Sequence, residues 1–139
     1  AEATGLPAPW EPRLREQGVG KYEGTPRDGA EFRISKTHFA DRYDGGESMM
    51  QLAQRVYNLL DELRQDENKT YLLVAHNGIA RVVESYFHDI PTEEYSAAGI
   101  KNCELVEYRI EVQQKAVGGF PTAFLFNRML CDSGKLCPW

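Results

Sequence analysis

The clearest pattern in this chain is an apolar stripe that repeats at the period of an α-helix. Apolar side chains recur every three or four residues from Met49 to Leu63, and charged or polar side chains occupy the positions between them. This spacing predicts an amphipathic helix with one buried face. Ser48 directly precedes the stripe, and serine accepts hydrogen bonds from first-turn N–H groups, so it marks the predicted start of the helix.

A second unit begins with a short apolar run and passes through a histidine into another helical pattern. Tyr71–Ala75 predicts a buried strand, His76 follows it, and apolar side chains recur at helical spacing from Gly78 to Phe87. Ligands of α/β folds bind beyond the carboxyl ends of the strands. The N-terminus of the following helix offers unpaired N–H groups to an anion. The pattern therefore predicts a phosphate-type anion site around His76.

The rest of the chain predicts shorter elements and loops. The polar stretch 25–44 indicates a long loop with one short helix near 30–36. Alternating side chains over 100–112 predict a half-buried strand. Residues 122–130 predict a last strand, which could form a hairpin with the one before it. A short acidic helix is expected after Thr92.

A glycine-rich loop precedes these elements. Gly18, Gly20 and Gly24 punctuate the stretch from Arg13, which predicts a structured loop rather than a helix or strand. Such a loop can present a carboxylate, here Glu16, into a cleft. A solvated surface turn is the alternative.

Composition narrows the classes of function. The chain has 139 residues, 42% of them hydrophobic, and a formal net charge of −5. One domain is the default at this length. The acidic balance argues against nucleic acid or an anionic membrane as a partner. No apolar run approaches the roughly 20 residues that a membrane span needs. We therefore expect neither partner.

Three cysteines bear on the compartment and on metal binding. Cys103, Cys131 and Cys137 form an odd set, which is a poor disulfide framework. A reducing, cytoplasmic setting is the simplest interpretation. The spacing of Cys131 and Cys137 is not that of a zinc site, and no metal is expected.

Four segments in this order resemble the histidine phosphatase superfamily, and within it the phosphoglycerate mutase-like, broad-specificity phosphatase branch. They are RLREQGVGKYEG, GGES before the long helix, LLVAHNGIARVV and IKNCELVEY. The resemblance covers about residues 1–110. It implies a three-layer α/β/α fold around a mostly parallel sheet. The expected organisation is one partial domain over 1–139, with 113–139 as a divergent C-terminal extension.

The resemblance also implies a chemistry, namely phosphoryl transfer on small phosphorylated metabolites through a phosphohistidine, without a cofactor. His76 corresponds to the second histidine of the family, which hydrogen-bonds the phosphoryl oxygens. Glu16 corresponds to the loop carboxylate that protonates the leaving oxygen and then activates water or a second substrate. The remaining phosphate-pocket residues implied in this way are Asn77, Gly78, Arg81, Gly46, Glu47 and Ser48.

The chain departs from the family pattern at the nucleophile. The attacking histidine of the family lies in an Arg-His-Gly motif at the end of an N-terminal strand. None of His38, His76 and His88 lies in such a motif. We therefore expect an N-terminally truncated member that is inactive alone. A non-catalytic remnant, acting as a phosphate-binding or interaction module of the same fold, is the alternative.

A missing central strand would affect assembly. Its absence leaves unpaired backbone groups at sheet edges, which invite pairing with another strand. Strand exchange between chains, insertion of the chain's own tail or oligomerisation would each repair this. We expect a homo-oligomer or strand-swapped dimer, using residues 122–130. The expected small-molecule partner is a phosphorylated substrate or inorganic phosphate.

Overall fold

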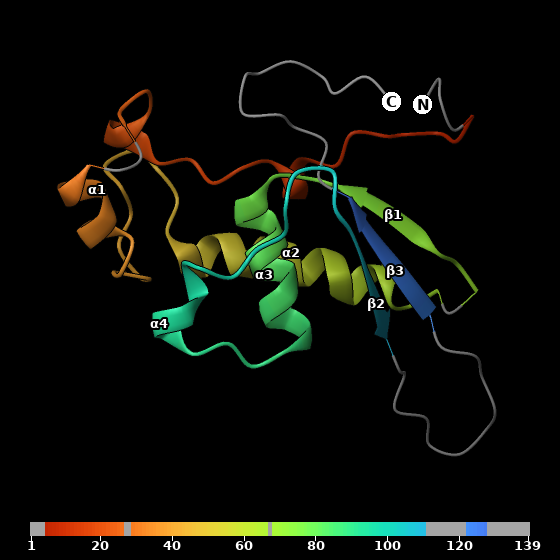
Figure 1. The fold of residues 1–139 in the computed structure, drawn as a ribbon. Helices are drawn as coiled ribbons and strands as arrows, with labels where there is room; N and C mark the ends of the chain where they lie inside the picture. The colour runs from red at the N-terminus through yellow and green to blue at the C-terminus, as the bar shows by residue number, and fades with distance from the viewer. Residues whose placement is uncertain (1–4, 27–28, 67, 111–121, 128–139) are drawn as a thin grey trace.

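The computed structural model describes residues 5–26, 29–66, 68–110 and 122–127 (Figure 1). The described elements combine helices with one sheet, so the fold is α/β. In chain order they are the 3₁₀ helices η1 (Pro12–Leu14) and η2 (Gly20–Tyr22), α1 (Ala30–Ser35), α2 (Met49–Leu63), β1 (Tyr71–Val74), α3 (Asn77–Phe87), α4 (Thr92–Tyr95), β2 (Leu105–Ile110) and β3 (Thr122–Asn127).

Helix α2 confirms the prediction from the apolar stripe. Ser48 caps it through a full capping box: the Ser48 hydroxyl accepts from the Gln51 backbone N–H, and the Gln51 side chain accepts from the Ser48 N–H. This arrangement pairs two N–H groups that have no partner inside the helix. The short helices expected near 30–36 and after Thr92 are also confirmed, as α1 and α4.

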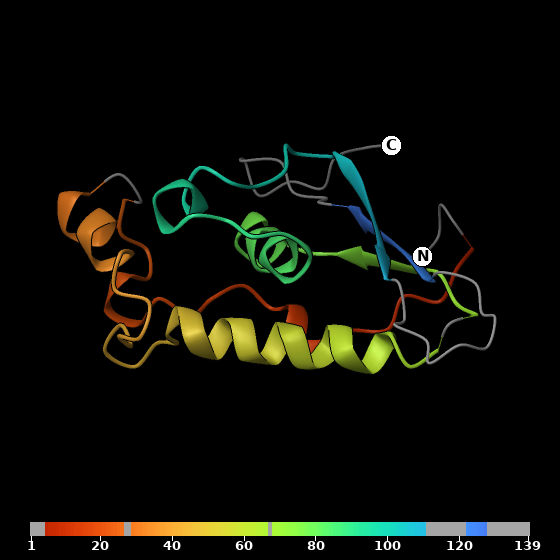
Figure 2. The ribbon, with the colours of Figure 1, turned by 90° about the horizontal axis from the view of Figure 1, so that it is seen from below.

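Helix α3 begins at Asn77, one residue before the predicted start at Gly78. His76 is its N-cap and has extended backbone angles, with φ −80° and ψ 164°. The apolar faces of α2 and α3 meet in the core, where Val56, Leu60 and Ile79 are completely buried. Figure 2 shows α2 running beneath both α3 and the sheet.

The sheet is mixed and contains the described strands in the order β1-β3-β2. β3 pairs in parallel with β1 and antiparallel with β2, so the chain places this late strand between the two earlier ones. The predicted hairpin partnership of the last two strands is confirmed. A mostly parallel sheet is not seen among the described strands, because one of the two pairings is antiparallel.

The ends of two strands differ from the prediction. β2 begins at Leu105 rather than near Ile100, because a turn precedes it: the Glu104 N–H donates to the Lys101 carbonyl, and Cys103 has a positive φ of 60°. The predicted extension 113–139 falls outside the described residues except for β3, and so does the end of the strand predicted over 122–130.

One face of the sheet packs on the helices and the other is open. Leu73 is buried toward the core, whereas its neighbours Leu72 and Val74 are 43% and 47% exposed, so the strand predicted to be buried over Tyr71–Ala75 is buried on one face only. The register aligns Val74 of β1 with Leu105 of β2 through β3, and Leu105 is also exposed. The open face therefore carries apolar side chains on both outer strands. No helix in the described ranges is long and apolar enough to cross a membrane.

Candidate functional site

The site begins where β1 passes into α3. His76 is half-buried at this junction, and its backbone carbonyl accepts the first hydrogen bond of the helix, from Ala80 at 3.0 Å. Its side chain makes no capping hydrogen bond. The N–H groups of the first turn have no acceptor inside the helix, and His76 is the residue that precedes them at this end of α3. This end has the positive partial charge that favours an anion.

Glu16 reaches the same helix end from the glycine-rich loop. A Cβ atom built on Gly78 would lie 2.4 Å from Glu16 Oε1, so the carboxylate rests against the bare Cα of this glycine. Glu16 Oε1 also accepts from the Gln17 N–H at 2.9 Å. The structure therefore brings Glu16, Gly78 and His76 together, and Glu16 is half-buried rather than a solvated turn residue.

Two glycine loops pack backbone against backbone beside this junction. Gly20 has a φ of +50°, and a Cβ atom there would lie 1.7 Å from the Tyr43 carbonyl. A Cβ atom on Gly46 would lie 2.6 Å from the Gly18 carbonyl. The Glu47 N–H donates to that carbonyl at 2.8 Å. Glycine is therefore required where the Glu16 loop meets the loop before α2.

Arg55, which the sequence pattern placed only on the polar face of α2, holds these loops. Its guanidinium pairs with both carboxylate oxygens of Glu47, at 2.7 Å and 2.8 Å. It also donates to the carbonyls of Arg13, Arg15 and Glu16. The Arg55 and Glu47 side chains are only 15% and 13% exposed. The only indication of this role in the sequence was the position of Arg55, a cationic residue two helical turns after Ser48 and beside the apolar stripe.

The predicted pocket-wall residues 46–48 have structural partners. The Glu47 carboxylate binds Arg55, and the Ser48 hydroxyl caps α2. The Glu47 carbonyl accepts from the Gln17 side chain at 2.9 Å, which ties it to the residue after Glu16. This segment therefore positions the Glu16 loop, and its direct contact with phosphate stays a prediction.

Asn77 and Arg81 face a different loop. Asn77 Oδ1 accepts from the Ile100 N–H at 3.0 Å, and a Cβ atom on Gly99 would lie 2.5 Å from that oxygen. The Arg81 guanidinium donates to the Ala98 carbonyl. Both side chains hold the 98–100 segment against α3, so the backbone N–H of Asn77 is the part suited to an anion.

Tyr95 of α4 is a further group near the site that sequence reasoning missed. Burial raises the pKa of its phenol above the usual value. The charge of Arg81 lowers this pKa and the charge of Glu16 raises it. The phenol therefore lies within electrostatic range of both. An aromatic residue in a four-residue helix has no periodic signal that could have found it.

The other histidines lie elsewhere. His38 pairs with Asp41 at 3.2 Å in the loop after α1, and His88 pairs with Glu84 at 2.7 Å at the opposite end of α3 from His76. Both side chains are exposed. Over the described part of the chain, no group of three or more His, Cys, Asp or Glu side chains could hold a metal ion.

We predict that Arg55→Gln loosens the Glu16 loop. The substitution leaves the Glu47 carboxylate and three carbonyls without their donor, which should lower the free energy of unfolding by about 1–3 kcal/mol. Urea unfolding measures this loss. Hydrogen exchange at the Gln17 and Gly18 amides should quicken. Arg109→Gln removes an exposed pair and is the control, with a change within about 1 kcal/mol. Equal exchange in both variants would contradict the role of Arg55.

Comparisons with known proteins identify the family of the chain. The model of the histidine phosphatase superfamily (branch 1) matches residues 1–120. A probable phosphoglycerate mutase GpmB of Erwinia tasmaniensis is 31% identical over 122 residues, which cover 82% of this chain and 56% of the relative. The chain thus spans about half the length of this curated relative. No solved structure matches the chain significantly. On the family match, the chain belongs to the histidine phosphatase superfamily.

Proposed function

We propose that this chain carries the acid and the phosphate-holding half of a phosphohistidine site that acts on small phosphorylated metabolites. One observation carries the proposal: the Glu16 carboxylate rests against Gly78 in the first turn of α3, two residues after His76. A donor, a helix N-terminus and a carboxyl group meet at this point. The phosphoglycerate mutase relative and the family match support the same class of reaction.

Each group has a task in phosphoryl transfer. The transferred group spreads negative charge over three oxygens, which His76 and the N–H groups of the first turn of α3 would stabilise. The leaving alkoxide needs a proton, which a positioned carboxyl group such as Glu16 would donate before it activates water or a second substrate. Mutase and phosphatase differ only in which acceptor Glu16 serves.

The chain alone would hold phosphate without completing turnover. In the family the phosphoryl group passes to a histidine within Arg-His-Gly, and neither His38 nor His88 lies in that motif. Both are engaged in exposed pairs away from the β1–α3 junction. We also propose a fold of three layers around a mostly parallel sheet, which the parallel pairing of β1 with β3 supports.

A non-catalytic phosphate-binding module is the second candidate. It is favoured by the engagement of Asn77 and Arg81 with the 98–100 segment and of Glu47 with Arg55, since these side chains then serve the fold. Phosphate binding is common to both candidates, and the step that separates them is proton donation by Glu16. A cytoplasmic location is proposed as well, and the exposed, unbridged thiol of Cys103 is compatible with it.

Phosphate or vanadate should bind at His76. In an NMR titration, the ring signals of His76 should shift saturably at millimolar ligand, because the anion sits against the imidazole and the first turn of α3. The ring signals of His38 and His88 in the same sample are the control and should stay in place. No shift at His76 would end the proposal.

The acid role of Glu16 is testable in a longer form that carries an Arg-His-Gly segment. There, Glu16→Gln should lower kcat by roughly 10²–10⁴-fold, because the amide cannot donate the proton to the leaving oxygen. Phosphate binding should remain nearly unchanged. The control is Glu23→Gln in the same loop, where the carboxylate accepts from the Val19 N–H. Retained turnover in the Glu16 variant would favour the non-catalytic module.

Self-association is the third proposal of this kind. β1 is an outer strand of the described sheet, and the backbone groups of such an edge invite pairing with another strand. Leu72 and Val74 add exposed apolar side chains to this strand. We expect light scattering to give the mass of two or more chains, with Val74→Lys shifting it toward the monomer. Ile34→Lys, at an exposed position of α1, is the matched control. A compact monomer that unfolds cooperatively would contradict the proposal.

A further inference from the structure

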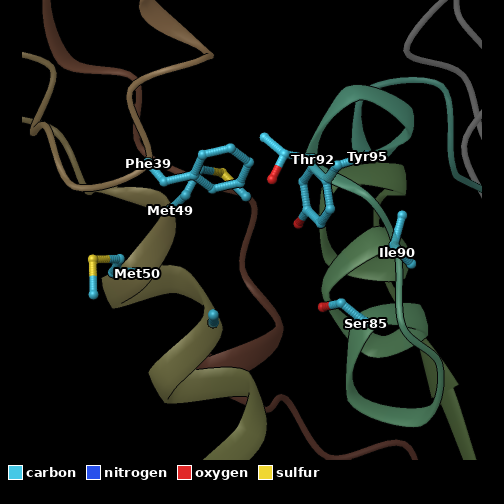
Figure 3. A pocket seen from close by; sticks show the side chains of 8 residues that line it. Phe39, Met49, Met50, Ser85, Ile90, Thr92 and Tyr95 are labelled. Atoms are coloured by element: carbon cyan, nitrogen blue, oxygen red, sulfur yellow. The ribbon is translucent and has the colours of Figure 1, made fainter.

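A half-open apolar cavity lies between the start of α2 and the α3–α4 segment (Figure 3). Its volume is about 230 Å³. The side chains that line it come from the loop before α2, from α2, from the end of α3 and from the region around α4. They include Phe39, Met49, Ala53, Ser85, Ile90 and Tyr95.

Two aromatic rings line this cavity, one from each side. Phe39 and Tyr95 have ring centroids 5.5 Å apart at an interplanar angle of 70°, an edge-to-face contact. The Phe39 carbonyl accepts from the Met50 N–H at 3.2 Å, which fixes the Phe39 loop on the first turn of α2. Figure 3 shows the Met49 side chain beside Phe39, with Tyr95 across from them. The cavity is therefore bounded by elements that the α2 cap and α3 already position.

The cavity and the proposed phosphate site share helix α3. Arg81 and Ser85 follow Asn77 at intervals of four residues, so the three lie on one face of the helix. From Gly78 to Ser85 the helix rises about 10 Å. Tyr95 of α4 lines the cavity, and Ser85 lines it from α3, the helix that begins at the proposed phosphate site.

The lining chemistry selects an apolar occupant. All the side chains that line the cavity are uncharged. The Ser85 hydroxyl is already paired with the Tyr57 hydroxyl at 3.0 Å and with the Val82 carbonyl at 2.9 Å. A carboxylate placed here would lose water without gaining a cation, which is costly. An aromatic ring fits, since an apolar cavity of about 150 Å³ holds benzene.

We propose that this cavity is the leaving-group subsite of the phosphate site, and that it takes the aromatic or branched aliphatic part of a phosphate monoester. The preferred substrates are then monophosphates of apolar alcohols rather than phosphorylated acids such as phosphoglycerate. The inference rests on the proposed phosphate site at His76, and it adds the class of alcohol that the site accepts.

Three phosphonates test the subsite on the chain as it exists. Methylphosphonate presents the anion alone, phenylpropylphosphonate adds a ring on a spacer, and carboxypropylphosphonate replaces that ring with a carboxylate. Calorimetry gives their affinities. The His76 ring signals report the phosphonate end, and the Met49 methyl signal reports the cavity. We expect phenylpropylphosphonate to bind at least tenfold more tightly than the other two and to shift both signals.

Two variants test whether the tighter binding of phenylpropylphosphonate comes from the cavity. Ala53→Phe fills it from α2 and should remove the tenfold advantage, while methylphosphonate binds as before. Gln54→Phe adds the same ring at the neighbouring exposed position and should keep the advantage. Because Ala53→Phe could disturb the fold, the Met49 shift in the unmodified chain is an independent measurement that needs no variant.

The outcomes separate the subsite from the phosphate site. Equal affinities for all three phosphonates, with a shift at His76 and none at Met49, would overturn the subsite and leave the proposed phosphate site standing. Tighter binding of carboxypropylphosphonate would overturn it as well. No shift at His76 with any of the three would overturn the phosphate site, and the subsite with it.

Discussion

The ion pair between Arg55 and Glu47 is the interaction on which the site depends. It joins three segments that are distant in the chain: η1 and the Glu16 loop, the glycine loop before α2, and the second turn of α2. Because Arg55 also binds the carbonyls of the Glu16 loop, the position of Glu16 follows the position of α2. The helix in turn is fixed by its buried contacts with α3, which carries His76 at its start. The packed pair of α2 and α3 therefore positions both Glu16 and His76.

Sequence patterns predicted the elements that are determined by interactions between residues close in the chain. Helix α2 follows from an apolar face of 3.6-residue period and from Ser48, whose hydroxyl pairs with a neighbour three residues away. The β1–His76–α3 unit follows from an apolar run next to a second helical pattern. These elements need little information from elsewhere in the chain, so the sequence alone indicated them. The placement of Glu16 near His76 came from the family resemblance, and the contact with Gly78 agrees with it.

Contacts between distant segments were not predictable in the same way. Nothing local indicates that Arg55 turns back to carbonyls about 40 residues earlier, or that Asn77 and Arg81 hold the 98–100 segment. The place of β3 between β1 and β2 is likewise a long-range choice. Alternation along a strand reveals which face is buried, but not which strand lies next to it. The mixed sheet and the cavity lined by Tyr95 also depend on contacts between distant segments, so sequence patterns did not predict them.

The contact between Glu16 and Gly78 sets a conflict between helix stability and chemistry. Glycine is a poor helix former, and alanine in its place commonly gains up to about 1 kcal/mol. Here the methyl group of alanine would occupy the space of Glu16 Oε1 and push the carboxylate away from the helix end. A substitution that makes α3 a better helix would therefore displace the Glu16 carboxylate. Selection for a more stable helix and selection for the present position of this carboxylate would act in opposite directions on this single methyl group.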